Sequence, residues 1–204
     1  MKIESYEERM QLFLDVDGVL LNFEQAFVRW LNDVYGMGLP PDYETPNWNF
    51  TDVLQPEQLK ERWHSFLASP EVARMPPLIE PTQFNQLTEQ HEVHLLTNFP
   101  VTFMEKRREN LESVGLQFDS LHYGGLHGFN GHHPPSKADL VRELRSDSLP
   151  ALFMDDHPDN CMDVAENCPG VEVWLMSRRF NAEFHHPDVR RAVDWGCLHT
   201  RLAD

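Results

Sequence analysis

The chain has 204 residues, three cysteines and a formal net charge of −16 at pH 7, which suits one buried core with at most a modest insertion. The negative charge argues against a nucleic-acid polymer or an anionic membrane as partner, because both bind basic surfaces. The sequence shows no signal-peptide core, no apolar run of membrane-spanning length and no C-x-x-C spacing, so we expect a cytoplasmic protein.

The first half of the chain predicts one strand followed by a helical insertion. Residues 11–17 are predicted to form the first strand, and residues 22–35 carry apolar side chains at helical spacing. A segment rich in proline, glycine and aromatics follows over residues 36–49, and residues 56–67 predict a second amphipathic helix. Prolines between positions 70 and 81 mark the return of the chain. We therefore predict a mainly helical cap over residues 22–80.

From residue 81 onward the predicted helices and strands alternate. Helices are predicted over residues 81–89 and 102–113, from Ser136 onward and over residues 161–167; strands are predicted over residues 93–97, 118–123, 151–154 and 171–176. Alternation of this kind indicates an α/β fold with a Rossmann-like parallel sheet. The core then comprises residues 1–21 and 81–204.

Acidic residues follow two of the predicted strands. Asp15 and Asp17, with Gly18 in the turn, end the first strand, and Asp155 and Asp156 end the strand over residues 151–154. Ligands bind at the carboxyl ends of strands in open α/β sheets. Because carboxylates crowded there repel one another, a hard divalent cation would remove the conflict, and oxygen ligands suit Mg²⁺.

Two further motifs point to an anion at the same edge. Thr97 and Asn98 follow the strand over residues 93–97, where a hydroxyl, an amide and backbone N–H groups can hold phosphoryl oxygens. Lys137 lies in the first turn of a helix that Ser136 is expected to cap. A lysine is disfavoured there by the helix dipole, so its position indicates an acidic partner.

These motifs, in this order, resemble the haloacid dehalogenase (HAD) superfamily of phosphohydrolases. Within it, residues 15–24, 155–159 and 173–181 are most similar to the 5′(3′)-deoxyribonucleotidase family. Two positions depart from that family's pattern: His157 stands where arginine is frequent, and Asn98 stands where serine is usual.

The resemblance implies a magnesium-dependent phosphomonoesterase with the HAD fold. Asp15 would be the nucleophile that forms an aspartyl phosphate, and Asp17 would protonate the leaving oxygen and then activate water. The metal ligands would be Asp15, the backbone carbonyl of Asp17, and Asp155. Asp156 would hold a water or Lys137.

The expected substrate is a small soluble phosphorylated metabolite, since a cap restricts access to the cleft. A nucleoside monophosphate is favoured by Phe23 and Trp48, which could stack on a base, although the same aromatics could form the core of the cap. Sugar phosphates and a non-catalytic HAD-fold binding module are the alternatives, and a homodimer is compatible with the sequence. His157 could touch the phosphate, whereas His127, His132 and His133 are expected to be solvated loop residues.

Overall fold

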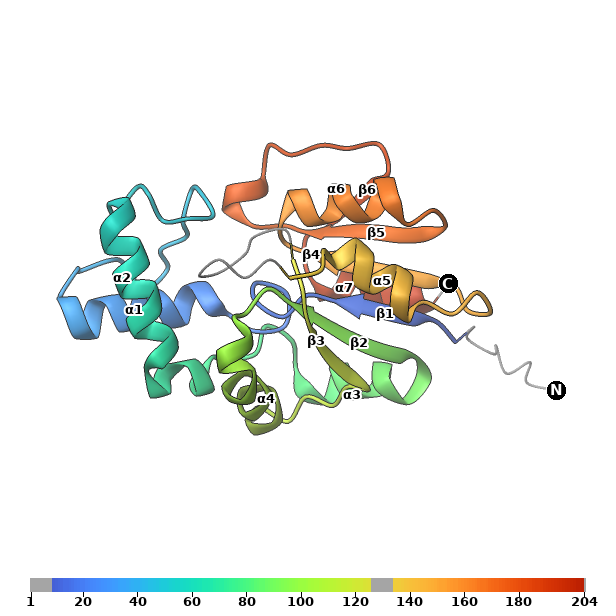
Figure 1. Cartoon of the computed structure of the whole chain (residues 1–204), viewed down its shortest axis with the longest axis horizontal. Helices are drawn as coiled ribbons and strands as arrows, with labels where there is room; N and C mark the ends of the chain where they lie inside the picture. The colour runs from blue at the N-terminus through green and yellow to red at the C-terminus, as the bar shows by residue number, and fades with distance from the viewer. Residues whose placement is uncertain (1–8, 126–133, 204) are drawn as a thin grey trace.

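The computed structural model describes residues 9–125 and 134–203, and in this part of the chain one parallel sheet carries helices on both faces (Figure 1). The order of its six strands is β3-β2-β1-β4-β5-β6, and every adjacent pair is parallel. The strands are β1 Gln11–Leu14, β2 Glu92–Thr97, β3 Ser120–Tyr123, β4 Ala151–Asp155, β5 Val171–Met176 and β6 Val189–Ala192. The predicted α/β class and parallel sheet are confirmed.

Strand β1 occupies the centre of the sheet, between β2 and β4. All four of its residues are buried, and its polar residue, Gln11, accepts a hydrogen bond from Ser146 N at 2.6 Å and donates to Leu144 O at 3.4 Å. The strand order reverses at β1, because the chain builds outward through β2 and β3 on one side and through β4, β5 and β6 on the other. Such a switch point opens a crevice at the carboxyl ends of the strands.

Helices α1 to α6 agree closely with the sequence pattern, and α7 was not predicted. The helices are α1 Phe23–Tyr35, α2 Pro56–Ala68, α3 Pro81–Gln90, α4 Met104–Ser113, α5 Lys137–Leu144, α6 Pro158–Asn167 and α7 Trp195–Ala203, with 3-10 turns η1 Pro70–Arg74, η2 Val101–Phe103 and η3 Arg179–Asn181. Ser136 caps α5 as expected: its hydroxyl accepts from Asp139 N at 3.1 Å, and the Asp139 carboxylate accepts from Ser136 N at 3.1 Å.

Two hydrophobic clusters lie on opposite faces of the sheet. Leu12 and Leu14 point into the larger one, which contains residues of α3, α4 and α7. Phe13 points to the other face and packs with α5 and α6. This alternation follows from the two-residue period of a strand and shows why β1 is apolar throughout.

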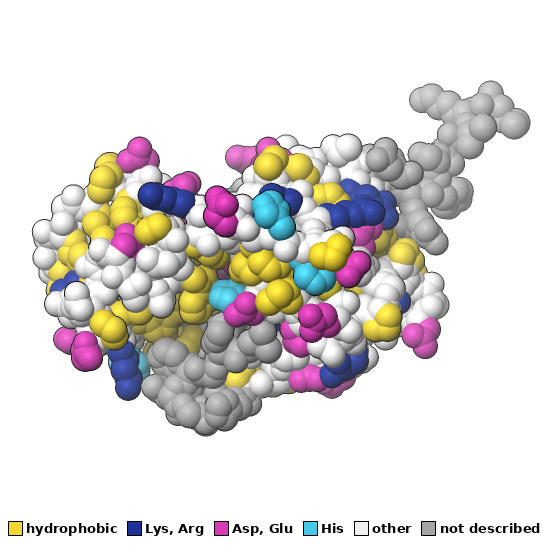
Figure 2. Space-filling model, turned by 90° about the horizontal axis from the view of Figure 1, so that it is seen from above, with side chains coloured by type: hydrophobic (Ala, Val, Ile, Leu, Met, Phe, Trp, Pro, Cys, Tyr) yellow, Lys and Arg dark blue, Asp and Glu magenta, His cyan; other side chains and the backbone are white. Residues whose placement is uncertain are grey.

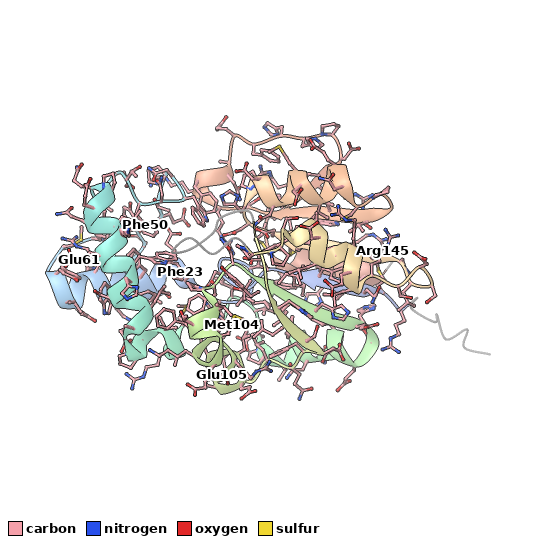
Figure 3. All side chains as sticks on the ribbon, in the orientation of Figure 1. Phe23, Phe50, Glu61, Met104, Glu105 and Arg145 are labelled. Atoms are coloured by element: carbon pink, nitrogen blue, oxygen red, sulfur yellow. The ribbon has the colours of Figure 1, made fainter. Side chains whose placement is uncertain are left out.

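Helices α1 and α2 lie beyond the carboxyl ends of the strands, at the left of Figure 1. The chain leaves and re-enters the core at adjacent points, because Asn22 N donates to Pro76 O at 2.8 Å and Leu78 N donates to Leu20 O at 2.7 Å. An aromatic cluster joins the two helices: the Phe23 ring lies 4.7 Å from that of Trp63 and 5.5 Å from that of Phe66. Figure 3 labels Phe23 and Phe50 on the side of this segment that faces the core.

The last strand and the last helix have no counterpart in the predicted elements. Strand β6 pairs with β5 at the edge of the sheet. Helix α7 packs on the face of the sheet that also carries α3, and the ring of its Trp195 meets Phe84 edge-on at 6.1 Å. No helix within the described ranges is both long and apolar enough to span a bilayer. Acidic, basic and hydrophobic side chains are interspersed on the face seen in Figure 2, so the negative charge is not gathered into one patch there.

Candidate active site

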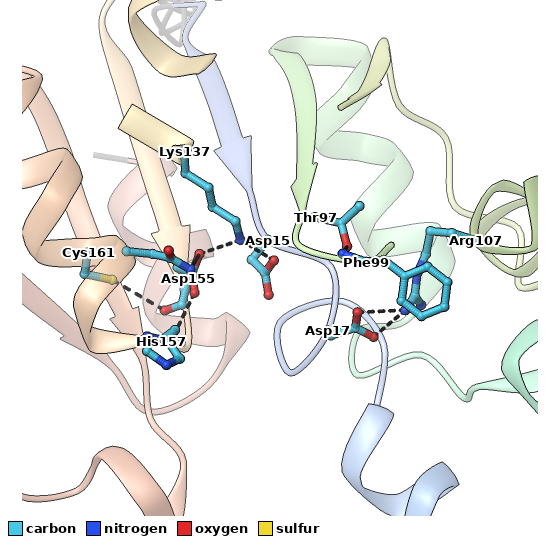
Figure 4. Close-up of polar contacts among 10 residues, drawn as sticks. Asp15, Asp17, Thr97, Phe99, Arg107, Lys137, Asp155, His157 and Cys161 are labelled. Atoms are coloured by element: carbon cyan, nitrogen blue, oxygen red, sulfur yellow. Dashed lines mark hydrogen bonds and ion pairs between the residues drawn. The ribbon is translucent and has the colours of Figure 1, made fainter. Parts of the chain in front are cut away.

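Lys137 joins the carboxyl ends of β1 and β4. Its Nζ donates to Oδ1 of Asp15 and, at 2.6 Å, to Oδ2 of Asp155 (Figure 4). All three side chains are buried. Asp15 directly follows β1, and its backbone N–H continues the ladder by donating to Met154 O at 2.8 Å. The acidic partner that the position of Lys137 predicted is therefore present.

The resemblance gave Asp156 two alternatives, holding a water or holding Lys137, and the second is wrong because Asp155 makes the contact with Lys137. Asp155 is still part of β4 and shares a face with Phe153, two residues earlier, toward α5. Lys137 is the first residue of α5, so it meets that face. Asp155 is further held by His157 N at 2.7 Å and by the Asn160 amide at 3.0 Å.

Asp15, Asp155 and Asp156 form a compact buried group in which one carboxylate oxygen of each residue lies within 4.8 Å of the others. Burial raises the pKa of Asp15 to about 7, although Lys137 opposes the shift. Burial also raises the pKa of Asp156 well above its ordinary value, and the charges of Asp15 and Asp155 raise it further. Burial lowers the pKa of Lys137, but Asp15 and Asp155 outweigh this effect and leave it raised.

This group fits a hard divalent cation. Lys137 contacts two of the three carboxylates, Asp15 and Asp155, so the group carries two uncompensated negative charges when all three are ionised, and burial makes those charges costly without a counter-ion. The three side chains of this group offer carboxylate oxygens, which suit magnesium. Gly18 supports the same arrangement, because its backbone has φ +77° and its Cα lies directly against the Asp156 carboxylate.

The carboxylate of Asp17 belongs to a different part of the site. Nη2 of Arg107 donates to both of its oxygens at 2.7 Å, and this pair stands apart from the Lys137 contacts in Figure 4. Asp17 nevertheless lines the cleft, and 27% of its side chain is exposed. Burial raises its pKa, and Arg107 opposes that shift.

Thr97 and Asn98 occupy the end of β2 but differ in exposure to the cleft. Thr97 is fully buried, and its Oγ1 accepts from Phe99 N at 3.2 Å, so its hydroxyl stabilises the turn. Asn98 lines the cleft, and its Oδ1 is buried without a hydrogen-bond partner among the described residues. Asn98 is thus the member of this pair that lines the cleft.

One cleft connects these groups with α1, α2 and the loop between them. Its wall includes the carboxylates, Lys137 and Asn98 on the core side and, on the other side, aromatic side chains from three stretches of that segment: Phe23, Trp48, Phe50 and Trp63. Phe23 is only 8% exposed, whereas Trp48 is 44% exposed. Trp48 also meets the His157 ring edge-on at 4.9 Å, which joins the two walls.

Several residues of the site carried no assignment from the sequence. Arg107 holds Asp17, Asn160 holds Asp155, and Arg178 lines the cleft while donating to the carbonyl of Gly18. Asn160 could have been found from its position one helical turn after the acidic pair. His127, His132 and His133 lie outside the described residues.

Solved structures share this architecture. A haloacid dehalogenase-like hydrolase from Streptococcus pneumoniae is 16% identical, with a TM-score of 0.60 over 95% of this chain and 98% of that one. The HAD-type hydrolase YfnB from Bacillus subtilis, in a structure bound to magnesium, is 16% identical with a TM-score of 0.62 over 97% and 100% of the two chains. The L-2-haloacid dehalogenase from Xanthobacter autotrophicus is 15% identical, with a TM-score of 0.61 over 96% and 98%. At these identities the likeness establishes the HAD fold.

The family comparison goes further than the fold. No curated protein sequence matches this chain. The profile of one family, however, matches residues 9–200, which includes every acidic residue of the site together with Thr97, Asn98 and Lys137. The chain therefore belongs to the family described as 5′ nucleotidase, deoxy (Pyrimidine), cytosolic type C protein, and is a phosphoric monoester hydrolase of the HAD superfamily.

Proposed function

We propose that this protein hydrolyses a small soluble phosphate monoester, favoured to be a deoxynucleoside monophosphate, through an aspartyl phosphate on Asp15 and with magnesium. The observation that carries the proposal is the convergence of Asp15, Asp155, Asp156 and Lys137 at the carboxyl ends of β1 and β4. A non-catalytic binding module has no use for three buried carboxylates that repel one another. The magnesium-bound structure of YfnB supports the choice of metal.

Each group has a role that follows from its position. The Asp15 carboxylate attacks phosphorus, and the ester oxygen leaves with the electron pair of the broken bond and takes a proton from Asp17. Asp17 then removes a proton from the water that attacks the aspartyl phosphate. The Asn98 amide and the Lys137 ammonium hold phosphoryl oxygens. Asp15, Asp155 and the backbone carbonyl of Asp17 would hold magnesium, with Asp156 beside them; when bound, the ion neutralises phosphoryl charge.

We propose that residues 22–80 act as the cap of this site. The segment supplies the aromatic wall of the cleft, and its chain leaves and re-enters the core next to the Asp15 turn. A wall of this kind admits a small ester and excludes a phosphoprotein or a polynucleotide. It also keeps bulk water from the aspartyl phosphate.

The aromatic wall favours a nucleotide over a sugar phosphate. Trp48 has an exposed face at the cleft and is placed to stack on a base, a contact worth about 1–3 kcal/mol in nucleic-acid complexes. Phe23 lines the same cleft, but its ring packs mainly against Trp63 and Phe66. We therefore assign the larger share of base recognition to Trp48. The family's description as a deoxynucleotidase of pyrimidine type agrees with this choice.

The test is turnover of p-nitrophenyl phosphate and of a panel of esters by the purified chain. Activity should require magnesium, disappear with EDTA and be lost in Asp15→Asn. In the panel, deoxynucleoside monophosphates should exceed sugar phosphates in kcat/KM. A ten-fold advantage for sugar phosphates, about 1.4 kcal/mol, would reject the nucleotide. Magnesium binding with no hydrolysis of any ester would instead favour a binding module.

A further inference from the structure

Arg107 is a fully buried arginine whose role no sequence motif explains. It lies on α4, which begins at the labelled Met104 in Figure 3, and its exposed fraction is 0%. Its Nη2 donates to both carboxylate oxygens of Asp17 at 2.7 Å. A buried guanidinium without a counter-ion is strongly unfavourable, so this contact is an essential part of the local structure.

The arginine is itself held rigidly in place. The Phe99 ring stacks on its guanidinium at 4.0 Å, and Nη1 lies 3.5 Å from the sulfur of Met75. Asn110, one turn further along α4, donates to Met75 O at 3.1 Å and ties that residue to the helix. Arg107 therefore presents Nη2 in one direction, toward the Asp17 turn.

The contact with Arg107 turns the Asp17 side chain in a different direction from the side chain of Asp15. Asp15 and Asp17 are two residues apart, yet Asp15 pairs with Lys137 while Asp17 pairs with Arg107 on the other side of the turn (Figure 4). The Asp17 carboxylate is consequently not part of the compact group of Asp15, Asp155 and Asp156, although it lines the same cleft. Two buried cations thus separate the four carboxylates into a group of three and a single one.

We propose that Arg107 is a positioning residue that aims the Asp17 carboxyl group at the ester oxygen of the substrate. The proposal rests on the role given to Asp17 under the proposed function. When the Asp15 oxygen bonds to phosphorus, the bond from phosphorus to the ester oxygen breaks, its electron pair stays on that oxygen, and the proton comes from Asp17. A carboxyl group fixed at the cleft wall makes this transfer more often than one that rotates freely.

The test compares two esters of nearly equal size, p-nitrophenyl phosphate and phenyl phosphate. Nitrophenolate leaves without help, whereas phenolate is more basic and needs the proton. Because kcat/KM covers only steps up to loss of the leaving group, it does not report on hydrolysis of the aspartyl phosphate. We expect Arg107→Met to lower kcat/KM for phenyl phosphate at least about ten-fold more than for p-nitrophenyl phosphate. Arg107→Lys keeps a positive charge at this position and should therefore show a smaller selective loss for phenyl phosphate than Arg107→Met.

Two further variants make the result specific. Arg108→Met removes the neighbouring, exposed arginine of α4 and should leave the ratio of the two kcat/KM values unchanged. Asp17→Asn should show the same selective loss as Arg107→Met, and the double variant should show no further selective loss, because both changes remove one function. Circular dichroism establishes that each variant is folded; if Arg107→Met is not, Arg107→Lys carries the test with a smaller selective loss.

The possible results distinguish a failure of the role proposed for Arg107 from a failure of the proton-donor role of Asp17 or of the proposed function. If Asp17→Asn is selective but the folded Arg107 variants lower both substrates equally, Arg107 has only a structural role and the proposal is wrong. If Asp17→Asn is not selective, the proton-donor assignment fails, and the role of Arg107 fails with it. Absence of hydrolysis by the wild-type protein with magnesium would reject the proposed function itself.

Discussion

Gly18 and Asp156 are packed so closely that a Cβ atom on Gly18 would lie 1.8 Å from Oδ2 of Asp156. Gly18 also has a positive φ of 77°, which residues with a side chain rarely adopt. The turn after β1 is thereby pressed against the end of β4, and this brings Asp15 within reach of Asp155 and Asp156. Asp15, Asp155 and Asp156 can therefore lie this close together only if residue 18 is a glycine.

Gly18→Ala should abolish most of the activity. Asp156 must move to admit the methyl group, and displacement of a catalytic group by about 1 Å can cost roughly 100-fold in rate. The matched control is Gly36→Ala at the end of α1, where φ is also positive, 62°, but no atom lies within 4 Å of the added Cβ. Both variants should lose about 1–2 kcal/mol of stability from backbone strain. Similar kcat values for the two variants would contradict this account of Gly18.

Lys137→Met should impair both stability and turnover. The change leaves Asp15 and Asp155 buried without their ammonium partner, and breaking a buried pair in this way costs about 3–5 kcal/mol. Chemical denaturation in EDTA measures this loss, and kcat with magnesium should fall at least about 100-fold. Lys60→Met, on the exposed face of α2, is the control and should behave as wild type. A Lys137→Met protein with wild-type stability would show that the carboxylates are neutralised in another way.

In the absence of metal, the buried carboxyl groups of Asp15 and Asp156 should make the folded chain less stable as pH rises. Burial raises the pKa of Asp15 to about 7 and that of Asp156 well above its ordinary value. The folded chain then holds these protons more tightly than the unfolded chain, so their contribution to stability falls as pH rises from about 4 through 7.

Asp156→Asn isolates this effect from other titrating groups. In EDTA, the melting temperature of the variant relative to wild type should be higher at pH 8 than at pH 5, because the variant lacks one ionising carboxyl group. Magnesium should reduce the difference at pH 8 by stabilising the wild-type carboxylates. The same relative melting temperature at both pH values would mean that Asp156 keeps an ordinary pKa.

Substitution of Trp48 and of Phe23 should have different effects, on nucleotide turnover in the first case and on stability in the second. Trp48→Ala should lower kcat/KM for a deoxynucleoside monophosphate by about 10–100-fold while sparing p-nitrophenyl phosphate. Tyr35→Ala, which removes another exposed aromatic of the same segment, is the control. Phe23→Ala should instead lose about 3–5 kcal/mol of stability, since the ring is buried against Trp63 and Phe66. Equal losses on both substrates in Trp48→Ala would make Trp48 a structural residue.

The sequence predicted the sheet and its acidic edge because each relevant strand is an apolar run that stops at a polar residue. Asp15, Thr97 and Asp155 follow or end β1, β2 and β4, and the parallel topology alone brings those ends together. Strand β6 was missed because Arg190 and Arg191 interrupt its apolar pattern. Their side chains meet these partners only in the folded chain, where Arg190 pairs with Glu172 and the Arg191 guanidinium donates to Oδ1 of Asn181.

Arg107 could not be predicted for a related reason. It stands between Lys106 and Arg108 on a strongly polar helix, and no local pattern distinguishes the three. Only the packing of α4 against η1 decides that Arg107 is the buried one. The choice of Asp155 over Asp156 as the partner of Lys137 likewise depends on which face of β4 meets α5.

Trapping the phosphate on Asp15 tests the proposed aspartyl-phosphate mechanism most directly. Enzyme is mixed with p-nitrophenyl [³²P]phosphate and magnesium, quenched in acid within milliseconds, and digested to peptides. Hydroxylamine-sensitive label should appear on the peptide that contains Asp15 before phosphate is released. Label on a different residue, or an Asp15→Asn variant that turns over at the wild-type rate, would contradict this mechanism.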